Sequence, residues 1–169
     1  MITTIQRQLR IFSVIWTFAR FIYGMWVARF GGIFMQDDEF MEFSIAHRRK
    51  YSIEHIWYQE NDEQFTVGLS DFLAKEIGEV FRVILPHADD EFDEDDEMFS
   101  IWTAAGKHSF RSPFSGTVME VNGEVEISPD LVNDSPYDLG WLIILKPHHL
   151  NDEELLDPDE YLEALEEVD

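Results

Sequence analysis

The stretch MFSIWTAAGKHSFRSPFSGTV, residues 98–118, holds two runs with strand character on either side of a short turn. Residues 98–104 and 109–118 are rich in apolar and aromatic side chains, and the segment between them contains Gly106 and Lys107. Apolar runs that flank a glycine-containing turn are typical of a β-hairpin. The stretch therefore predicts an exposed hairpin that presents a side chain at its turn, and Lys107 is its only lysine.

Short strands are also expected on both sides of this hairpin. The pattern of apolar runs and turn residues predicts strands at residues 51–59, 65–69, 79–85, 117–121, 124–127 and 141–145. In the first of them, His55 and Trp57 are expected on one face, and Asn122-Gly123 predicts a two-residue hairpin turn between 117–121 and 124–127. So many short strands predict a mainly β protein with short helices, folded as a small sandwich or barrel.

Two short helices complete the expected domain. Ser70 is a typical helix N-cap, because its short side chain accepts a hydrogen bond from the first free N–H groups, and Gly78 is placed to end that helix. The last helix is expected at residues 157–168, where Tyr161 and Leu165 belong to an apolar stripe.

The chain is strongly acidic outside its first 36 residues. Residues 37–169 contain all 35 acidic residues and eight of the 12 basic ones, a net charge of about −27. Such a surface repels nucleic-acid phosphates and anionic lipids, so nucleic-acid binding and membrane binding are not expected. It suits docking onto basic protein surfaces, and a salt-adapted proteome explains it equally well. The absence of cysteine excludes disulfides and thiolate chemistry.

Residues 1–36 form a separate block that is basic, apolar and free of acid. Three interpretations stay open: a mitochondrial transit peptide, a membrane anchor, or an upstream extension before Met35 or Met41. Arg20 and Arg29 count against a membrane span, because charges inside the bilayer are costly. The domain itself is expected at residues 50–169, in the cytoplasm, or in the mitochondrial matrix if 1–36 is a transit peptide.

Neither the acidic run nor the histidines predict a metal or catalytic site. Residues 89–97, DDEFDEDDE, lack the alternating ligands and the glycine of a calcium loop, so we expect a solvated, mobile loop. His148 and His149 are neighbours on an expected strand and would point to opposite faces. His108 lies beside Lys107, where exposed polar cover is the simplest interpretation. No nucleophile–base–acid set appears, so the chain is not expected to be an enzyme.

Four segments together resemble the glycine cleavage system H-protein family, which carries lipoyl/biotinyl-type domains. They are YSIEHIW (51–57), TVGLSDFLAKEIGEV (66–80) followed by RVILP (82–86), SPFSGTVMEVN (112–122) and SPDLVNDSPYDLGWLIILK (128–146). The last is the most specific, with five residues in family order: Asn133, Pro136, Tyr137, Gly140 and Trp141.

The resemblance implies a fold, a covalent cofactor and a set of partners. The fold would be a barrel-sandwich hybrid of two antiparallel sheets with a C-terminal helix. A lipoyl group, amide-linked to a lysine at a hairpin tip, would carry an aminomethyl group. The implied partners are a pyridoxal-phosphate glycine decarboxylase, an aminomethyltransferase, dihydrolipoyl dehydrogenase and lipoate ligase.

The hairpin departs from the family at the lysine itself. In the family, a Glu-Ser-x-Lys-Ala segment places the lysine eight residues before the proline of Ser-Pro-x-Ser-Gly, which here falls on Ala105. The family glutamate falls on Trp102. Lys107 is the nearest substitute and is the candidate lipoyl attachment site if the turn is shifted by two residues. The alternative is an H-like binding or regulatory module without a lipoyl group.

Overall fold

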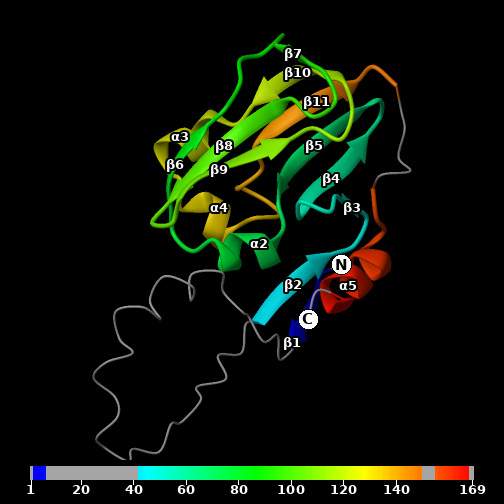
Figure 1. The fold of residues 1–169 in the computed structure, drawn as a ribbon, viewed down its shortest axis with the longest axis vertical. Helices are drawn as coiled ribbons and strands as arrows, with labels where there is room; N and C mark the ends of the chain where they lie inside the picture. The colour runs from blue at the N-terminus through cyan, green and yellow to red at the C-terminus, as the bar shows by residue number, and fades with distance from the viewer. Residues whose placement is uncertain (1, 7–41, 150–154, 168–169) are drawn as a thin grey trace, which may run out of the picture.

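The computed structural model describes residues 2–6, 42–149 and 155–167, and its strands form three antiparallel sheets (Figure 1). The interpretations of residues 1–36 therefore lie mostly outside the described residues. Among the residues that are described, no helix has the length and apolarity needed to cross a bilayer.

The largest sheet has six strands in the order β3-β4-β5-β11-β10-β7. Its strands are β3 (Lys50–Tyr51), β4 (Ile56–Asn61), β5 (Gln64–Leu69), β7 (Glu91–Phe92), β10 (Gly116–Val121) and β11 (Ile143–Pro147). Along β5, Phe65 and Val67 are buried, because alternate residues of a strand point to the same face. This face forms one half of the main core.

The facing sheet has three strands, β6 (Val80–Ile84), β8 (Glu97–Thr103) and β9 (Gly106–Arg111), in the order β6-β8-β9. One buried hydrophobic cluster contains side chains from both sheets, including Val83, Ile101 and Phe110 from this sheet and Val67 and Leu145 from the other. Two antiparallel sheets around a shared apolar core confirm the expected mainly β sandwich.

A third sheet is a two-stranded ribbon of β1 (Ile2–Gln6) and β2 (Glu42–Ala46). The ribbon lies beside the C-terminal helix α5 (Pro158–Glu167) at one end of the molecule (Figure 1). Phe43 and Ile45 of β2 pack in a second hydrophobic cluster with Trp57 and Tyr161. Strand β2 thus packs against the domain expected at residues 50–169.

The residues of the most specific sequence segment tie the sandwich to its helices. Asn133 lies in α4 (Leu131–Asp134); its side-chain oxygen accepts from the Val80 N–H at 3.0 Å. Its amide donates to the carbonyls of Ala74 and Gly78 at 2.7 and 2.9 Å. One side chain therefore satisfies three backbone groups where helix α2 (Asp71–Glu76) leads into β6.

The first helix follows its sequence signals. The Ser70 hydroxyl accepts from the N–H of Leu73 at 3.2 Å, and Gly78 takes the left-handed φ of 74° just after the helix. Both predictions are confirmed. Asp71, which the dipole of the helix favours at its N-terminus, is buried and also accepts from the backbone N–H and hydroxyl of Ser44 in β2.

The hairpin turn expected at Asn122-Gly123 is wrong. These residues begin a short helix, α3 (Gly123–Ile127), in which the Asn122 side chain accepts from the Glu124 N–H at 3.2 Å. Asn122 also donates to the carbonyls of Leu139 and Trp141. Asparagine is favoured both in turns and at helix N-caps, and these tertiary hydrogen bonds select the cap.

The single strand expected at residues 51–59 is interrupted. Residues 52–55 form a turn between β3 and β4, and His55 adopts a left-handed φ of 63°. His55 therefore does not share a strand face with Trp57. Its Nδ1 lies 2.9 Å from the Tyr161 hydroxyl, which connects this turn to α5, and burial lowers the pKa of the imidazole.

The acidic run is more ordered than expected. Its centre forms β7, whose Phe92 is buried and pairs with Gly116 of β10. The carboxylates of Asp90 and Asp96 accept from the N–H groups of His87 and Asp93, at 2.8 and 2.9 Å, and close two turns. Within the described residues, no three or more potential metal-ligating side chains are grouped to hold an ion.

Replacing Gly140 with alanine is expected to destabilise the fold by about 1–3 kcal/mol. A Cβ at this position would lie 2.5 Å from the Leu131 carbonyl oxygen and 2.8 Å from that of Ser135, and backbone cannot move aside cheaply. Gly123→Ala is the matched control, since its Cβ meets nothing within 4 Å. Urea unfolding should separate the two variants, and equal midpoints would contradict this packing.

Candidate carrier hairpin

The β8–β9 hairpin closes through a two-residue turn of Ala104 and Ala105. Thr103 pairs with Gly106, Trp102 with Lys107, and Ile101 with His108. Both alanines are exposed, and neither has a positive φ, whereas Gly106 has a φ of 120°. Glycine adopts such a φ without steric cost, so the sequence fixes the turn immediately before it.

Side chains next to the turn hold it in place. The Thr103 hydroxyl accepts from the Ala105 N–H at 3.2 Å and lies 3.1 Å from Nε2 of His108. Beneath the hairpin, Ile101 is fully buried, and the rings of Phe99 and Phe110 pack with centroids 5.3 Å apart. The position of the tip is therefore set by the sandwich core. His108, expected as polar cover, is half-buried and braces the turn.

The structure places Ala105 in the turn and Lys107 in strand β9. Ala105 is the position on which the family lysine falls when residues are counted back from Pro113. A two-residue shift of the turn, which would bring Lys107 to the tip, is not observed, because Lys107 pairs with Trp102 across the hairpin. The exposed tip therefore presents a methyl group.

The Lys107 side chain extends away from the tip. Its ammonium group donates to both carboxylate oxygens of Glu97, at 2.9 and 3.2 Å, and Glu97 is the first residue of β8. Hydrogen bonds from Lys107 and then Ser109 lower the pKa of the Glu97 carboxyl. Both side chains are about 40% exposed, so solvent and salt screen this pair. The amine is accessible but is directed toward the base of the hairpin.

Replacing Lys107 with alanine is expected to raise the pKa of Glu97 toward its ordinary value. The depressed pKa means that the pair stabilises the fold above the unfolded-state pKa, and that this contribution is lost as the pH falls through the folded-state value. Carboxyl NMR titration measures the change. Lys146→Ala is the control, because Lys146 pairs with Glu63 instead. An unchanged Glu97 pKa in the Lys107 variant would contradict the Lys107–Glu97 ion pair and the direction that it gives the lysine side chain.

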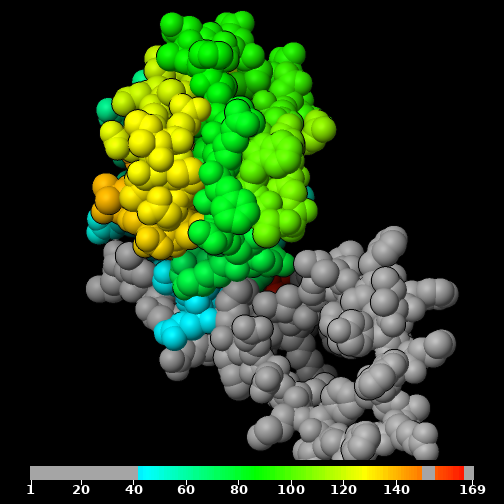
Figure 2. Space-filling model, turned by 90° about the vertical axis from the view of Figure 1, so that its left-hand side faces the viewer, coloured from blue at the N-terminus to red at the C-terminus, as the bar shows by residue number. Residues whose placement is uncertain are grey.

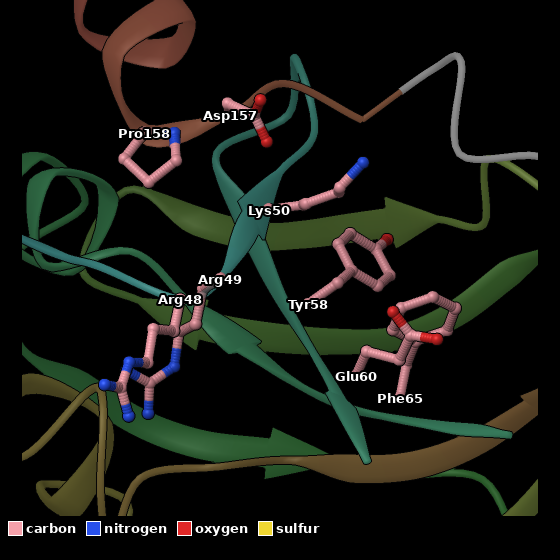
Figure 3. A pocket seen from close by; sticks show the side chains of 8 residues that line it. All are labelled: Arg48, Arg49, Lys50, Tyr58, Glu60, Phe65, Asp157 and Pro158. Carbon is pink, nitrogen blue, oxygen red and sulfur yellow. The ribbon is translucent and has the colours of Figure 1, made fainter. Parts of the chain in front are cut away.

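A pocket of about 310 Å³ lies away from this hairpin, between β3, β4 and the start of α5. Its lining includes three consecutive basic residues, Arg48, Arg49 and Lys50, but their side chains do not converge: the arginines point to one side of β3 and Lys50 to the other (Figure 3). The Arg49 guanidinium packs over the Trp57 ring, 4.6 Å from its centroid, and donates to the Tyr137 carbonyl. Arg49 thus has a structural role.

The histidine pair lies just beyond β11, which ends at Pro147. Both His148 and His149 are exposed, and Nε2 of His148 lies 3.0 Å from the Thr117 hydroxyl. His148 thus contacts β10, the strand that pairs with β11.

Sequence reasoning missed the exposed aromatic residues near the tip. In the sequence, Trp102 stands out only as the residue at the family glutamate position, whereas in the structure it is 41% exposed. Phe81, in β6, is 56% exposed although strict alternation from the buried Val83 would place it inward. A bulge between Val80 and Arg82 explains the difference, and nothing in the sequence marks that bulge.

A two-sheet sandwich that displays one side chain on a braced hairpin tip is the architecture of a lipoyl-type carrier domain. A family model described as "Glycine cleavage H-protein" matches residues 49–168. The chain belongs to the glycine cleavage H-protein family. Residues 2–6 and 42–46, which form the β1–β2 ribbon, lie outside the matched region.

Individual relatives agree with this assignment. The chain is 34% identical over 125 residues to the glycine cleavage system H protein of Halalkalibacterium halodurans, covering 73% of this chain and 98% of that protein. It is 37% identical over 119 residues to that of Staphylococcus epidermidis, covering 70% and 94%. The fold is similar to a crystal structure of the H protein from Mycobacterium marinum, with a TM-score of 0.65 and 24% identity, covering 70% of this chain and 97% of that one.

Proposed function

We propose that this chain is a non-catalytic H-protein-like binding module that docks onto enzymes of glycine cleavage without carrying a lipoyl arm. The observation that supports it most is the hairpin turn, where Ala105 stands at the family lysine position. A lipoyl group is attached by an amide bond to a side-chain amine, and alanine has no side-chain amine. The tip residue therefore does not fit the cofactor.

A second candidate function is that of a carrier lipoylated on Lys107. Two observations favour it: the Lys107 side chain is 40% exposed, and Lys107 is the second residue after the turn. Attachment there would neutralise the ammonium group and remove its ion pair with Glu97. The acceptor would also stand on a strand instead of a tip, which changes the geometry that a ligase must recognise.

The family supports the choice of partners: the pyridoxal-phosphate glycine decarboxylase, the aminomethyltransferase and dihydrolipoyl dehydrogenase, with lipoate ligase for the second candidate. The large negative charge favours docking onto basic surfaces and accelerates encounter with them. The relatives named above come from bacteria, which favours the cytoplasm over a mitochondrial matrix.

Competition in a reconstituted glycine cleavage assay tests the proposal. With a lipoylated H protein as the limiting carrier, the unmodified chain is expected to raise the apparent KM for that carrier and leave kcat unchanged, because both proteins occupy the same partner surface. Support of turnover by the chain alone, after treatment with lipoate ligase, would favour the Lys107 carrier instead. Absence of either effect would overturn both candidates.

A further inference from the structure

The outer face of the three-stranded sheet carries an unusual set of exposed side chains beside the hairpin tip. We name this set, Phe81, Arg82, Ile84 and Trp102, the outer-sheet patch. Phe81, Ile84 and Trp102 are 56%, 37% and 41% exposed, and they are three of the seven large hydrophobic residues that are exposed within the described residues. Figure 2 shows the face on which β6 runs between the hairpin and the segment that contains α3.

The sheet register places these residues together. Arg82 pairs with Trp102, and Ile84 pairs with Ser100, so Ile84 and Trp102 are diagonal neighbours on one face. The inward residues between them, Val83 and Ile101, are buried in the core. The bulge between Val80 and Arg82 adds Phe81 to the exposed set. The patch therefore lies on a rigid support and spans two neighbouring strands.

Its composition is that of an interface centre. Tryptophan and arginine are enriched among the residues that contribute most to protein–protein binding. The Arg82 guanidinium is exposed and has no ion-pair partner within the described part of the chain, and Trp102 lies opposite it. Covering these exposed aromatic rings with a partner would favour binding, because it removes apolar area from water.

The charge around the patch selects the kind of partner. Glu79 precedes β6, and Glu124 and Glu126 lie on α3, which packs beside β6; all three are exposed. Together with the net charge of −23, these carboxylates favour a partner with a basic rim around an apolar centre. They also oppose a second copy of this chain, because two strongly acidic faces repel each other.

We propose that the outer-sheet patch is the docking surface for an enzyme whose active-site mouth is apolar at its centre and basic at its rim. The proposal rests on the proposed function and adds the surface through which it operates. Trp102 immediately precedes Thr103, which braces the turn, so the patch lies directly beside the tip that a partner would receive. The family glutamate position has thereby become an apolar anchor.

Binding to purified pyridoxal-phosphate glycine decarboxylase, measured by titration calorimetry, tests the proposal. The double variant Phe81→Ser and Trp102→Ser is expected to raise the Kd by at least about 30-fold, because truncation of hot-spot residues costs binding free energy of this size. Ile53→Ser is the matched control: Ile53 is 80% exposed, but it lies in the turn between β3 and β4. Thermal unfolding should show that all variants remain folded.

Each outcome separates the patch from the proposed function. Binding by the wild type that the double variant retains would overturn the patch and leave the proposed function standing. Absence of binding by the wild type would overturn both. Self-association of the wild type that the double variant loses, detected by sedimentation velocity, would assign the patch to a second copy and overturn an enzyme partner.

Discussion

Replacing Ala105 with lysine is expected to make this chain a good substrate for lipoate ligase. The position is exposed in the turn and has no positive φ, so a lysine fits there without backbone strain. Its amine would extend from the tip and attack the carboxyl carbon of a lipoyl group that the ligase has activated with ATP as an acyl adenylate, so that the amide forms as AMP and a proton leave. Because misplacement of a reacting group by about 1 Å can cost about 100-fold in rate, we expect at least about 100-fold faster modification than of wild type.

Intact mass spectrometry over a time course with purified ligase measures this gain. A second variant that adds Trp102→Glu restores the acidic residue of the family segment and should be modified at least as fast. Lys107→Arg is the control, added to the Ala105→Lys chain with and without Trp102→Glu. It should leave the modification of both chains unchanged. Equal modification of the wild type and the Ala105→Lys chain would show that Lys107 already serves as the acceptor, and would contradict a tip without an attachment site.

Replacing Trp57 with alanine is expected to destabilise the protein by about 3–5 kcal/mol. Trp57 is 1% exposed, and its indole N–H donates to the Pro136 carbonyl at 2.9 Å. The substitution would open a cavity in the second hydrophobic cluster, leave that carbonyl without its donor and remove the ring beneath the Arg49 guanidinium.

Trp57→Phe separates packing from hydrogen bonding. It keeps an aromatic ring and loses the N–H donor, so we expect a cost of about 1–3 kcal/mol from the unsatisfied carbonyl. Urea unfolding of both variants, with unchanged slopes, measures the difference. A loss of less than about 1 kcal/mol in the free energy of unfolding for Trp57→Ala would mean that the β1–β2 ribbon and α5 do not depend on this cluster.

Local signals in the sequence predicted the elements whose causes are local. Ser70 caps its helix through its own side chain, and Gly78 ends it with a left-handed φ. The first hairpin arm, β5 and the terminal helix also follow from apolar periodicity, within a few residues at each end. The second arm, expected at 109–118, is wrong in extent: β9 ends at Arg111, and residues 112–115 separate it from β10. The sheets could be paired only through the resemblance to the H-protein family, since strand pairing is a property of distant residues.

The features that the sequence did not predict depend on contacts between distant residues. Asn122 begins a helix because two carbonyls of residues 139 and 141 hold its amide. His55 leaves the strand because a turn places its ring against Tyr161, over a hundred residues away. The burial of β2 follows from Phe43, Ile45 and the Asp71 contact with Ser44. None of these partners can be identified from neighbouring residues.

The features of the candidate site were likewise predictable only in part. Counting back from Pro113 identified Ala105 as the family lysine position, and the structure places that residue in the turn. The direction of the Lys107 side chain was not predictable, because its partner Glu97 lies at the opposite end of the paired strand. Phe81 is exposed through a bulge, which shifts the alternation of its strand.

Peptide mapping by mass spectrometry of this chain, purified from its own lipoate-replete cells, tests most directly whether the hairpin carries a lipoyl arm. We predict that the peptide containing Ala105 and Lys107 has its unmodified mass. A lipoyl group on Lys107 in most of the protein would contradict this prediction and identify the chain as a carrier with a displaced arm.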